Sequence, residues 1–132
     1  MTLQEYLKQI GETEINTEVM EKVYDEYSDD LPEIVGKIIT NAKEAVFLDG
    51  CRILSLEEIL DASQDLDIDF KEKEMIPLID CGDNDFVVYH FSEDSWSKFN
   101  IADETVFKKK HSLEELVKAL VHWTRAFMLH HV

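Results

Sequence analysis

The sequence predicts an α+β domain, an antiparallel sheet of about five or six strands with helices packed on one face. The order of the expected elements is the first observation. Helices come first, short strands follow with one helix inserted among them, and a helix closes the chain, as in folds that pack helices against an antiparallel sheet. The length of 132 residues suits one domain, residues 1–132. A hydrophobic content of 45% is enough for a buried core in spite of the high charge.

Capping residues mark where helices start. Ser-Leu-Glu-Glu occurs at 55–58 and again at 112–115, and both copies match a capping box, in which the serine and the second glutamate satisfy backbone amides. The second box is expected to open a long final helix. Pro32 is expected as the first residue of another helix, where its missing N–H costs nothing. Residues 2–10 predict a helix, and apolar residues over 19–27 predict a second one whose other side is almost wholly acidic.

Short apolar runs bounded by turn residues predict the strands. Residues 45–48 and 51–54 flank Asp49-Gly50 and predict a tight hairpin, because Asp-Gly supplies the positive φ angles that such a turn requires. Residues 85–91 are apolar on both faces, which predicts a central strand covered on both sides. The charged stretch 61–74 predicts a long loop. The other strands are expected at 75–79, 96–99 and 105–108.

The charge is distributed unevenly along the chain. Residues 1–97 carry 25 acidic and 7 basic side chains, whereas residues 98–132 carry 4 acidic and 6 basic ones. A field of one sign attracts oppositely charged proteins and raises their association rate. Residues 1–97 lack the cluster of lysine and arginine side chains that phosphate binding needs, which argues against direct nucleic-acid binding. The predicted partner is a basic protein, and the chain itself is expected to be a monomer or a weak dimer.

The sequence also bounds the compartment. No apolar run approaches the roughly 20 residues needed to cross a bilayer, and the N-terminal residues do not resemble a secretion signal. We therefore expect a cytoplasmic protein without membrane contact. In such a compartment Cys51 and Cys81 are expected to be two buried thiols, and a disulfide between them is the alternative.

Motifs for catalysis are weak. Asp65, Asp67 and Asp69 alternate as in a calcium loop, but an EF-hand that begins at Asp65 needs glycine and glutamate at the positions of Phe70 and Ile76. A solvated acidic loop is the better interpretation. The chain shows no nucleophile elbow, phosphate-binding glycine loop or zinc-type Cys/His cluster, so we expect no enzyme, catalytic residue, metal or cofactor. The alternative, a small metal-dependent hydrolase, would use Asp80, Asp83, Asp85 and His90.

Several segments resemble a known family in their order and spacing. Leu31-Pro32 stands at a helix start, and 47–59 is a hairpin that runs into a helix. Residues 76–89 hold the strand pair with Ile76-Pro77-Leu78, Gly82-Asp83 and Asp85-Phe86-Val87-Val88-Tyr89, and 96–116 holds closing strands and the second capping box. Together, over about residues 31–120, they resemble the SUKH superfamily, which includes yeast cell-wall synthesis regulators and many bacterial immunity proteins.

The resemblance implies a single SUKH-like domain without catalysis and, in bacteria, a cytoplasmic antitoxin for a secreted toxin, often a nuclease. Nuclease toxins need basic surfaces for phosphates, and the acidic field of this chain would attract one. We therefore expect a non-enzymatic immunity protein that neutralises a basic toxin domain through an acidic surface. The alternative is a cytoplasmic regulatory or scaffold module. The expected partner-binding residues are Asp65, Asp67, Asp69, Asp83, Asp85, Glu93, Asp94 and, as an aromatic anchor, Trp96, for which core packing is the alternative.

Overall fold

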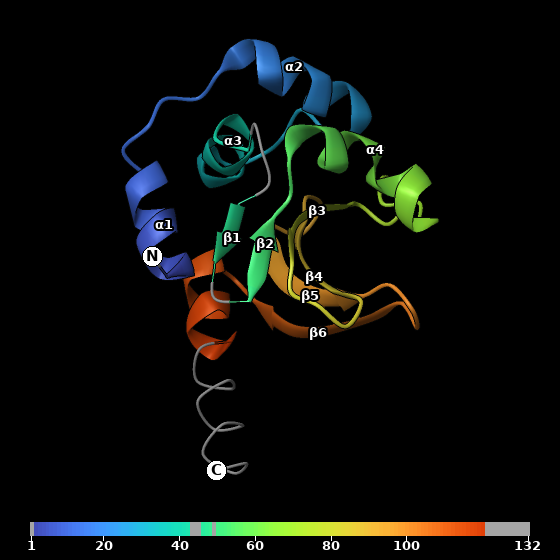
Figure 1. Cartoon of the computed structure of the whole chain (residues 1–132). Helices are drawn as coiled ribbons and strands as arrows, with labels where there is room; N and C mark the ends of the chain where they lie inside the picture. The colour runs from blue at the N-terminus through green and yellow to red at the C-terminus, as the bar shows by residue number, and fades with distance from the viewer. Residues whose placement is uncertain (1, 43–45, 49, 121–132) are drawn as a thin grey trace, which may run out of the picture.

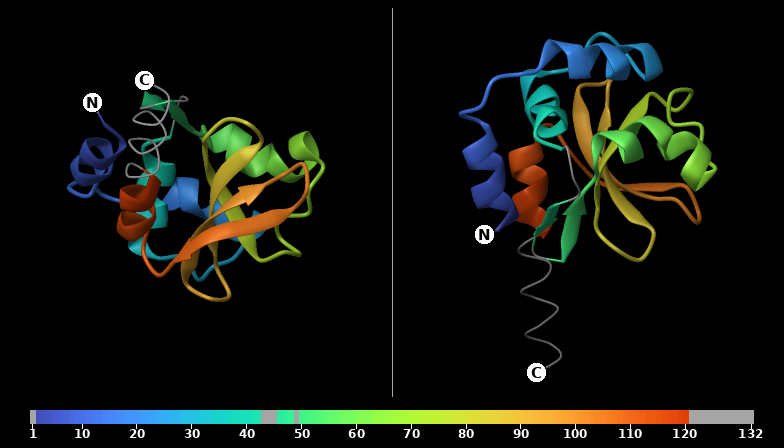
Figure 2. Two further views of the ribbon diagram at one scale, coloured as in Figure 1. Left: turned by 90° about the horizontal axis from the view of Figure 1, so that it is seen from below. Right: turned by 45° about the horizontal axis from the view of Figure 1, so that its top comes forward.

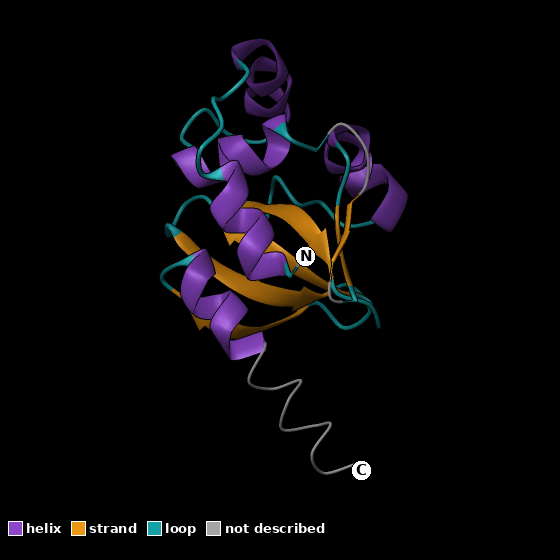
Figure 3. Ribbon diagram, turned by 60° about the vertical axis from the view of Figure 1, so that its left-hand side comes forward, coloured by secondary structure: helices purple, strands orange, loops and turns teal. Residues whose placement is uncertain are grey.

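A computed structural model describes residues 2–42, 46–48 and 50–120 of the chain. Its sheet has six antiparallel strands in the order β1-β2-β3-β4-β5-β6, so each strand pairs with its neighbour in the sequence. The helices lie on one side of this sheet (Figures 1 and 3). The predicted α+β class is therefore confirmed.

The helices and strands follow the predicted order. A final helix at 113–120 lies beside α1 (Figure 2), and the expected extension of this helix lies outside the described residues. Within the described ranges, every helix is too short or too polar to cross a lipid bilayer. The elements are α1 (Leu3–Ile10), α2 (Thr17–Glu26), α3 (Glu33–Thr40), β1 (Val46–Leu48), β2 (Cys51–Ile53), α4 (Leu56–Leu66), β3 (Met75–Asp80), β4 (Asp85–His90), β5 (Ser95–Asn100) and β6 (Thr105–Lys110).

The predicted caps fix the helix starts. The hydroxyl of Ser55 accepts the N–H of Glu58 at 3.2 Å, and the Glu58 carboxylate accepts the N–H of Ser55 at 3.1 Å, which completes the capping box of α4. The hydroxyl of Ser112 likewise accepts the N–H of Glu115 at 3.1 Å. Pro32 has extended backbone, with φ −69° and ψ 161°, and immediately precedes α3. Its backbone carbonyl accepts the N–H of Val35 at 3.1 Å. The prediction that Pro32 is the first helical residue was wrong by one position.

The charged stretch 61–74 is not one long loop, as predicted, because α4 runs into it. Asp67 ends the helix in the left-handed conformation, with φ 55°. The hydroxyl of Ser63 then accepts the N–H of Phe70 at 3.2 Å, and the buried ring of Phe70 meets that of Phe99 edge-on, with centroids 6.1 Å apart. The prediction was wrong because the solvated face of a helix carries as much charge as a loop.

Strand β4 is covered on both faces, as predicted. Side chains alternate along a strand, so Phe86, Val88 and His90 share one face while Val87 and Tyr89 share the other. All five are 7% exposed or less. The hairpin of β1 and β2 is confirmed by the pairing of Leu48 with Cys51, although Asp49 lies outside the described residues.

The two edges of the sheet are unequal. At one edge, β1 has only three residues. At the other, β6 carries Lys108, Lys109 and Lys110, and its register with β5 shifts between Trp96 and Lys98. Lys108 stands in this irregular stretch with a φ of 54°.

Candidate functional site

Two of the predicted partner-binding carboxylates are paired with cations of this chain. Asp85 is 3.5 Å from the ammonium of Lys98, a side chain that is 11% exposed, and accepts a hydrogen bond from Asn100 at 2.8 Å. Glu93 forms an ion pair with Lys109 of β6, which lowers its pKa below the ordinary value. Because each of these carboxylates is paired with a lysine of the sheet, Asp85 and Glu93 add little to the negative potential outside the protein.

The structure does not support Trp96 as an exposed anchor. Trp96 is 3% exposed and stands opposite Tyr89 in the β4–β5 ladder, with ring centroids 5.0 Å apart. It is a core residue, as the alternative interpretation held. The expectation of an anchor was wrong because a single tryptophan in a strand does not reveal which neighbours will cover it.

The predicted acidic loop is spread over different local structures. Asp65 lies on the exposed face of α4, Asp67 ends that helix, and Asp69 accepts the N–H of Glu72 at 3.1 Å in the next turn. Asp83 is exposed in the β3–β4 turn with a φ of 52°. In the described ranges, no group of three or more His, Cys, Asp or Glu side chains is placed to hold a metal ion.

The four residues of the hydrolase alternative do not form one constellation. His90 and Asp85 occupy opposite ends of the six-residue strand β4. Asp80 is bound to the guanidinium of Arg52 at 3.4 Å and caps the N–H of Gly82 at 2.9 Å. The buried ring of His90 is 2.6 Å from the hydroxyl of Ser97, which is itself fully buried, so this pair lies within the core.

Helix α2, which the sequence predicted as an amphipathic helix but not as a site, carries exposed acidic side chains. The buried side of α2 holds Met20 and Val23, whereas its acidic side chains are exposed. Lys22 is the one basic residue of this helix. Within the described part of the chain, the following exposed carboxylates of α2 and of the segment after it take part in no ion pair: Glu18, Glu21, Asp25, Glu26, Asp29 and Asp30.

A buried tyrosine joins this surface to α4, which lies beside α2 at the top of Figure 1. The hydroxyl of Tyr27 donates a hydrogen bond to the carbonyl of Ile59 at 2.5 Å. Burial raises the pKa of Tyr27, and the negative charges of Glu26 and Asp61 raise it further. Carboxylates from α2 and α4 therefore flank the same phenol, and Asp65 lies one turn beyond Asp61 on α4.

A second tyrosine joins the same surface to the sheet. The hydroxyl of Tyr89 donates to Asp94 in the β4–β5 turn at 2.8 Å. Burial raises the pKa of Tyr89, as do the hydrogen bond with Asp94 and the charges of Asp94 and Asp30. We call the whole surface the acidic ridge. Its members are Glu18, Glu21, Asp25, Glu26, Asp29, Asp30, Asp61, Asp65 and Asp94.

Tyr24 gives the acidic ridge an exposed aromatic side chain. It is 37% exposed and lies on α2 between Glu21 and Asp25. In the sequence, Tyr24 belongs to the apolar side of the helix predicted over 19–27. Tyr24 lies at the border between the apolar and the acidic side of this helix. A residue at such a border is covered on one side only, so its position could have identified Tyr24 as exposed.

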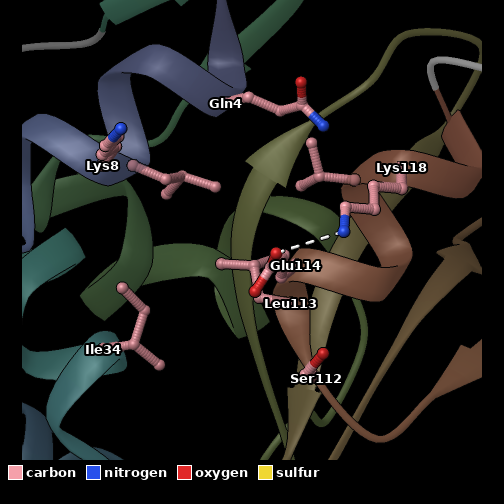
Figure 4. Close-up of a pocket in the computed structure, with 9 residues that line it drawn as sticks. Gln4, Lys8, Ile34, Ser112, Leu113, Glu114 and Lys118 are labelled. Carbon is pink, nitrogen blue, oxygen red and sulfur yellow. Dashed lines mark ion pairs between the residues drawn. The ribbon is translucent and has the colours of Figure 1, made fainter.

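A pocket lies apart from the acidic ridge, between α1, α3 and the final helix (Figure 4). Its volume is about 690 Å³. Its apolar lining is Leu7, Ile34, Leu113 and Val117, and its polar lining is Gln4, Lys8, Ser112, Glu114 and Lys118. Glu114 and Lys118 form an ion pair at 3.2 Å, so they neutralise each other at the rim.

Comparisons with family models, with curated proteins and with solved structures found no match for this chain. The likeness to the SUKH superfamily therefore rests on the sequence motifs alone.

The raised pKa of Tyr27 predicts that the fold weakens in alkali. The folded-state pKa lies above the ordinary value of 10.0, so the stability that this residue contributes is complete below pH 10.0 and is lost as the pH rises toward the folded-state value. We expect the free energy of unfolding to fall between about pH 9 and pH 11, and to fall less in Tyr27→Phe. Urea unfolding at both pH values measures the difference.

The variant Tyr24→Phe is the matched control, since it removes the hydroxyl of an exposed tyrosine on the same helix. At neutral pH, Tyr27→Phe is expected to lose about 1 kcal/mol through the hydrogen bond to Ile59. An alkaline loss of stability that is the same with and without the Tyr27 hydroxyl would contradict the assignment.

Proposed function

We propose that the protein is a non-enzymatic immunity protein that binds a basic toxin domain, of the nuclease type, through the acidic ridge. One observation carries this proposal. Exposed carboxylates of α2, α4 and the β4–β5 turn form no ion pair among the described residues, and several of them lie close enough together to act on the same tyrosines, Tyr27 and Tyr89. In contrast, carboxylates such as Asp85 and Glu93 are neutralised by this chain's own lysines.

The energetics of α2 support a role in binding. Glu21 follows Glu18 by three residues and precedes Asp25 by four, so these like charges are neighbours on one helix face. Each such pair destabilises a helix by about 0.2–0.5 kcal/mol. A small domain stays soluble with much less charge of one sign. An unfavourable concentration of charge on the surface is explained if a cationic partner neutralises it.

The ridge also has the chemistry to compete with nucleic acid. A nuclease holds phosphates with lysine and arginine side chains. A row of carboxylates is negatively charged, as nucleic acid is, and can bind those same side chains in its place. Long-range attraction would give rapid capture. Tyr24 would give slow release, because tyrosine is among the residues that dominate binding energy at interfaces.

Co-expression with the product of the adjacent gene tests the proposal. We expect cells to survive the toxin when this chain is present, the two proteins to copurify, and the affinity to fall as salt rises, because exposed charges are screened over about 10 Å at 0.1 M salt. Binding that is unchanged up to molar salt would contradict a role for the ridge. Copurification of a basic cellular protein with no toxin activity would favour the regulatory module instead.

A further inference from the structure

The sulfur atoms of Cys51 and Cys81, 30 residues apart in the sequence, lie side by side where β2 begins and β3 has just ended. Strands β2 and β3 pair Arg52 with Asp80 and Ile53 with Ile79. Continued by one residue, this register places Cys51 opposite Cys81. The two sulfur atoms are 3.6 Å apart, within reach of an S–H···S hydrogen bond and longer than a disulfide bond of about 2.05 Å.

The hydrogen-bond pattern of the ladder shows which kind of pair this is. The N–H of Leu54 donates to the carbonyl of Leu78 at 3.0 Å, so positions 54 and 78 form a hydrogen-bonded pair. Hydrogen-bonded and non-hydrogen-bonded pairs alternate along an antiparallel ladder, which makes 51 and 81 a non-hydrogen-bonded pair. Cα atoms in such pairs are about 4.5 Å apart, and this value lies within the span of about 4.4–6.8 Å that a disulfide bridges.

The pair can also be reached from solvent. Both cysteines are only partly buried, and each adjoins an exposed glycine at the end of its strand, Gly50 or Gly82. A Cβ atom placed on either glycine would have nothing within 4 Å. The adjacent Cys51 sulfur and burial raise the pKa of Cys81.

We propose that Cys51 and Cys81 form a reversible disulfide that cross-links β2 to β3 by exchange with a low-molecular-weight disulfide such as oxidised glutathione. The thiolate of one of the two cysteines attacks one glutathione sulfur, which breaks the glutathione S–S bond and releases one glutathione thiolate. The second cysteine then gives up its proton and attacks the sulfur of the first, which forms the protein S–S bond and releases the second glutathione. Two electrons pass from the protein thiols to oxidised glutathione, which leaves as two reduced molecules.

The cross-link would secure the weakest part of the sheet. Strand β2 meets β3 through only two registered pairs, and the side chain of Arg52 adds contacts with Glu58 at 2.6 Å and with Asp80 at 3.4 Å. The disulfide would close a loop that contains α4 and would restrict the unfolded chain. We expect it to raise the midpoint of thermal unfolding by roughly 10 °C.

Titration of the purified full chain with mixtures of reduced and oxidised glutathione tests this proposal. We expect a monomer whose mass falls by two hydrogen atoms, which loses both titratable thiols, unfolds at a higher temperature and is restored by dithiothreitol. The variants Cys81→Ser and Cys51→Ser are each expected to stop at a mixed disulfide on the cysteine that remains.

Three results would overturn the proposal. The first is that both thiols stay reduced in the folded chain, under glutathione mixtures that oxidise the same thiols in the urea-unfolded chain. The second is a disulfide that joins two copies of the chain rather than two cysteines of one copy. The third is a cross-linked monomer that unfolds at a lower temperature than the reduced chain. The unaltered chain alone decides between these outcomes, so poor folding of a variant does not affect the test. The acidic ridge plays no part in this inference.

Discussion

Neutralising the centre of the acidic ridge is expected to slow association with a basic partner by about 10- to 100-fold at low salt. The variant carries Glu21→Gln, Asp25→Asn and Asp29→Asn, three exposed carboxylates that have no ion pair among the described residues. Their field steers the encounter, so the loss is expected in the association rate and is expected to shrink as salt screens the field. Stopped-flow mixing with the copurified partner at several salt concentrations measures it.

A control of equal net charge separates the ridge from the overall charge of the chain. Glu33→Gln, Glu104→Gln and Glu114→Gln remove carboxylates that are paired with Lys37 at 3.0 Å, Lys73 at 2.8 Å and Lys118 at 3.2 Å. This variant is expected to associate at nearly the original rate. Equal slowing of both variants would show that total charge, rather than the ridge, attracts the partner.

Trp96→Ala is expected to destabilise the fold by about 3–5 kcal/mol, because it empties a core site beside Tyr89. Tyr24→Ala is expected to change stability by less than about 1 kcal/mol. It is expected to weaken partner binding by about 10- to 100-fold, mainly through faster dissociation. Urea unfolding of both variants, together with dissociation rates for the folded ones, separates the core role from the interface role.

The conservative variant Trp96→Phe keeps most of the core volume and is expected to bind normally. A Trp96→Ala protein with unchanged stability and lost binding would restore Trp96 as the anchor. Normal binding by Tyr24→Ala would remove Tyr24 from the interface and leave the acidic ridge without an aromatic contact.

The parts of the fold that could be predicted depend on local chemistry. A serine and a glutamate three residues apart satisfy the amides at the start of α4 within one turn, so the capping box is visible in the sequence. The β1–β2 hairpin and the doubly covered strand β4 are local in the same sense, because turn residues and side-chain alternation involve near neighbours. The α+β class follows from the order of such elements.

For the partner-binding site, the sequence could predict only that its charge is negative. Whether a carboxylate projects an unpaired charge depends on its neighbours across the sheet, and these are distant in sequence: Lys98 for Asp85, and Lys109 for Glu93. The sequence therefore could not separate Asp85 and Glu93, which are paired, from aspartates such as Asp65, which is exposed and has no ion pair among the described residues. For the same reason the register that brings Cys51 to Cys81 could not be predicted, since it depends on how β2 aligns with a strand that comes after α4.

The unequal edges of the sheet bear on aggregation. An open strand edge offers unpaired N–H and C=O groups to a strand of another molecule, and natural sheets resist this with lysines, irregular backbone and short edge strands. Strand β6 has the lysines and the irregular backbone, and β1 is only three residues long. We therefore expect neither edge to be a good template for growth into a fibre.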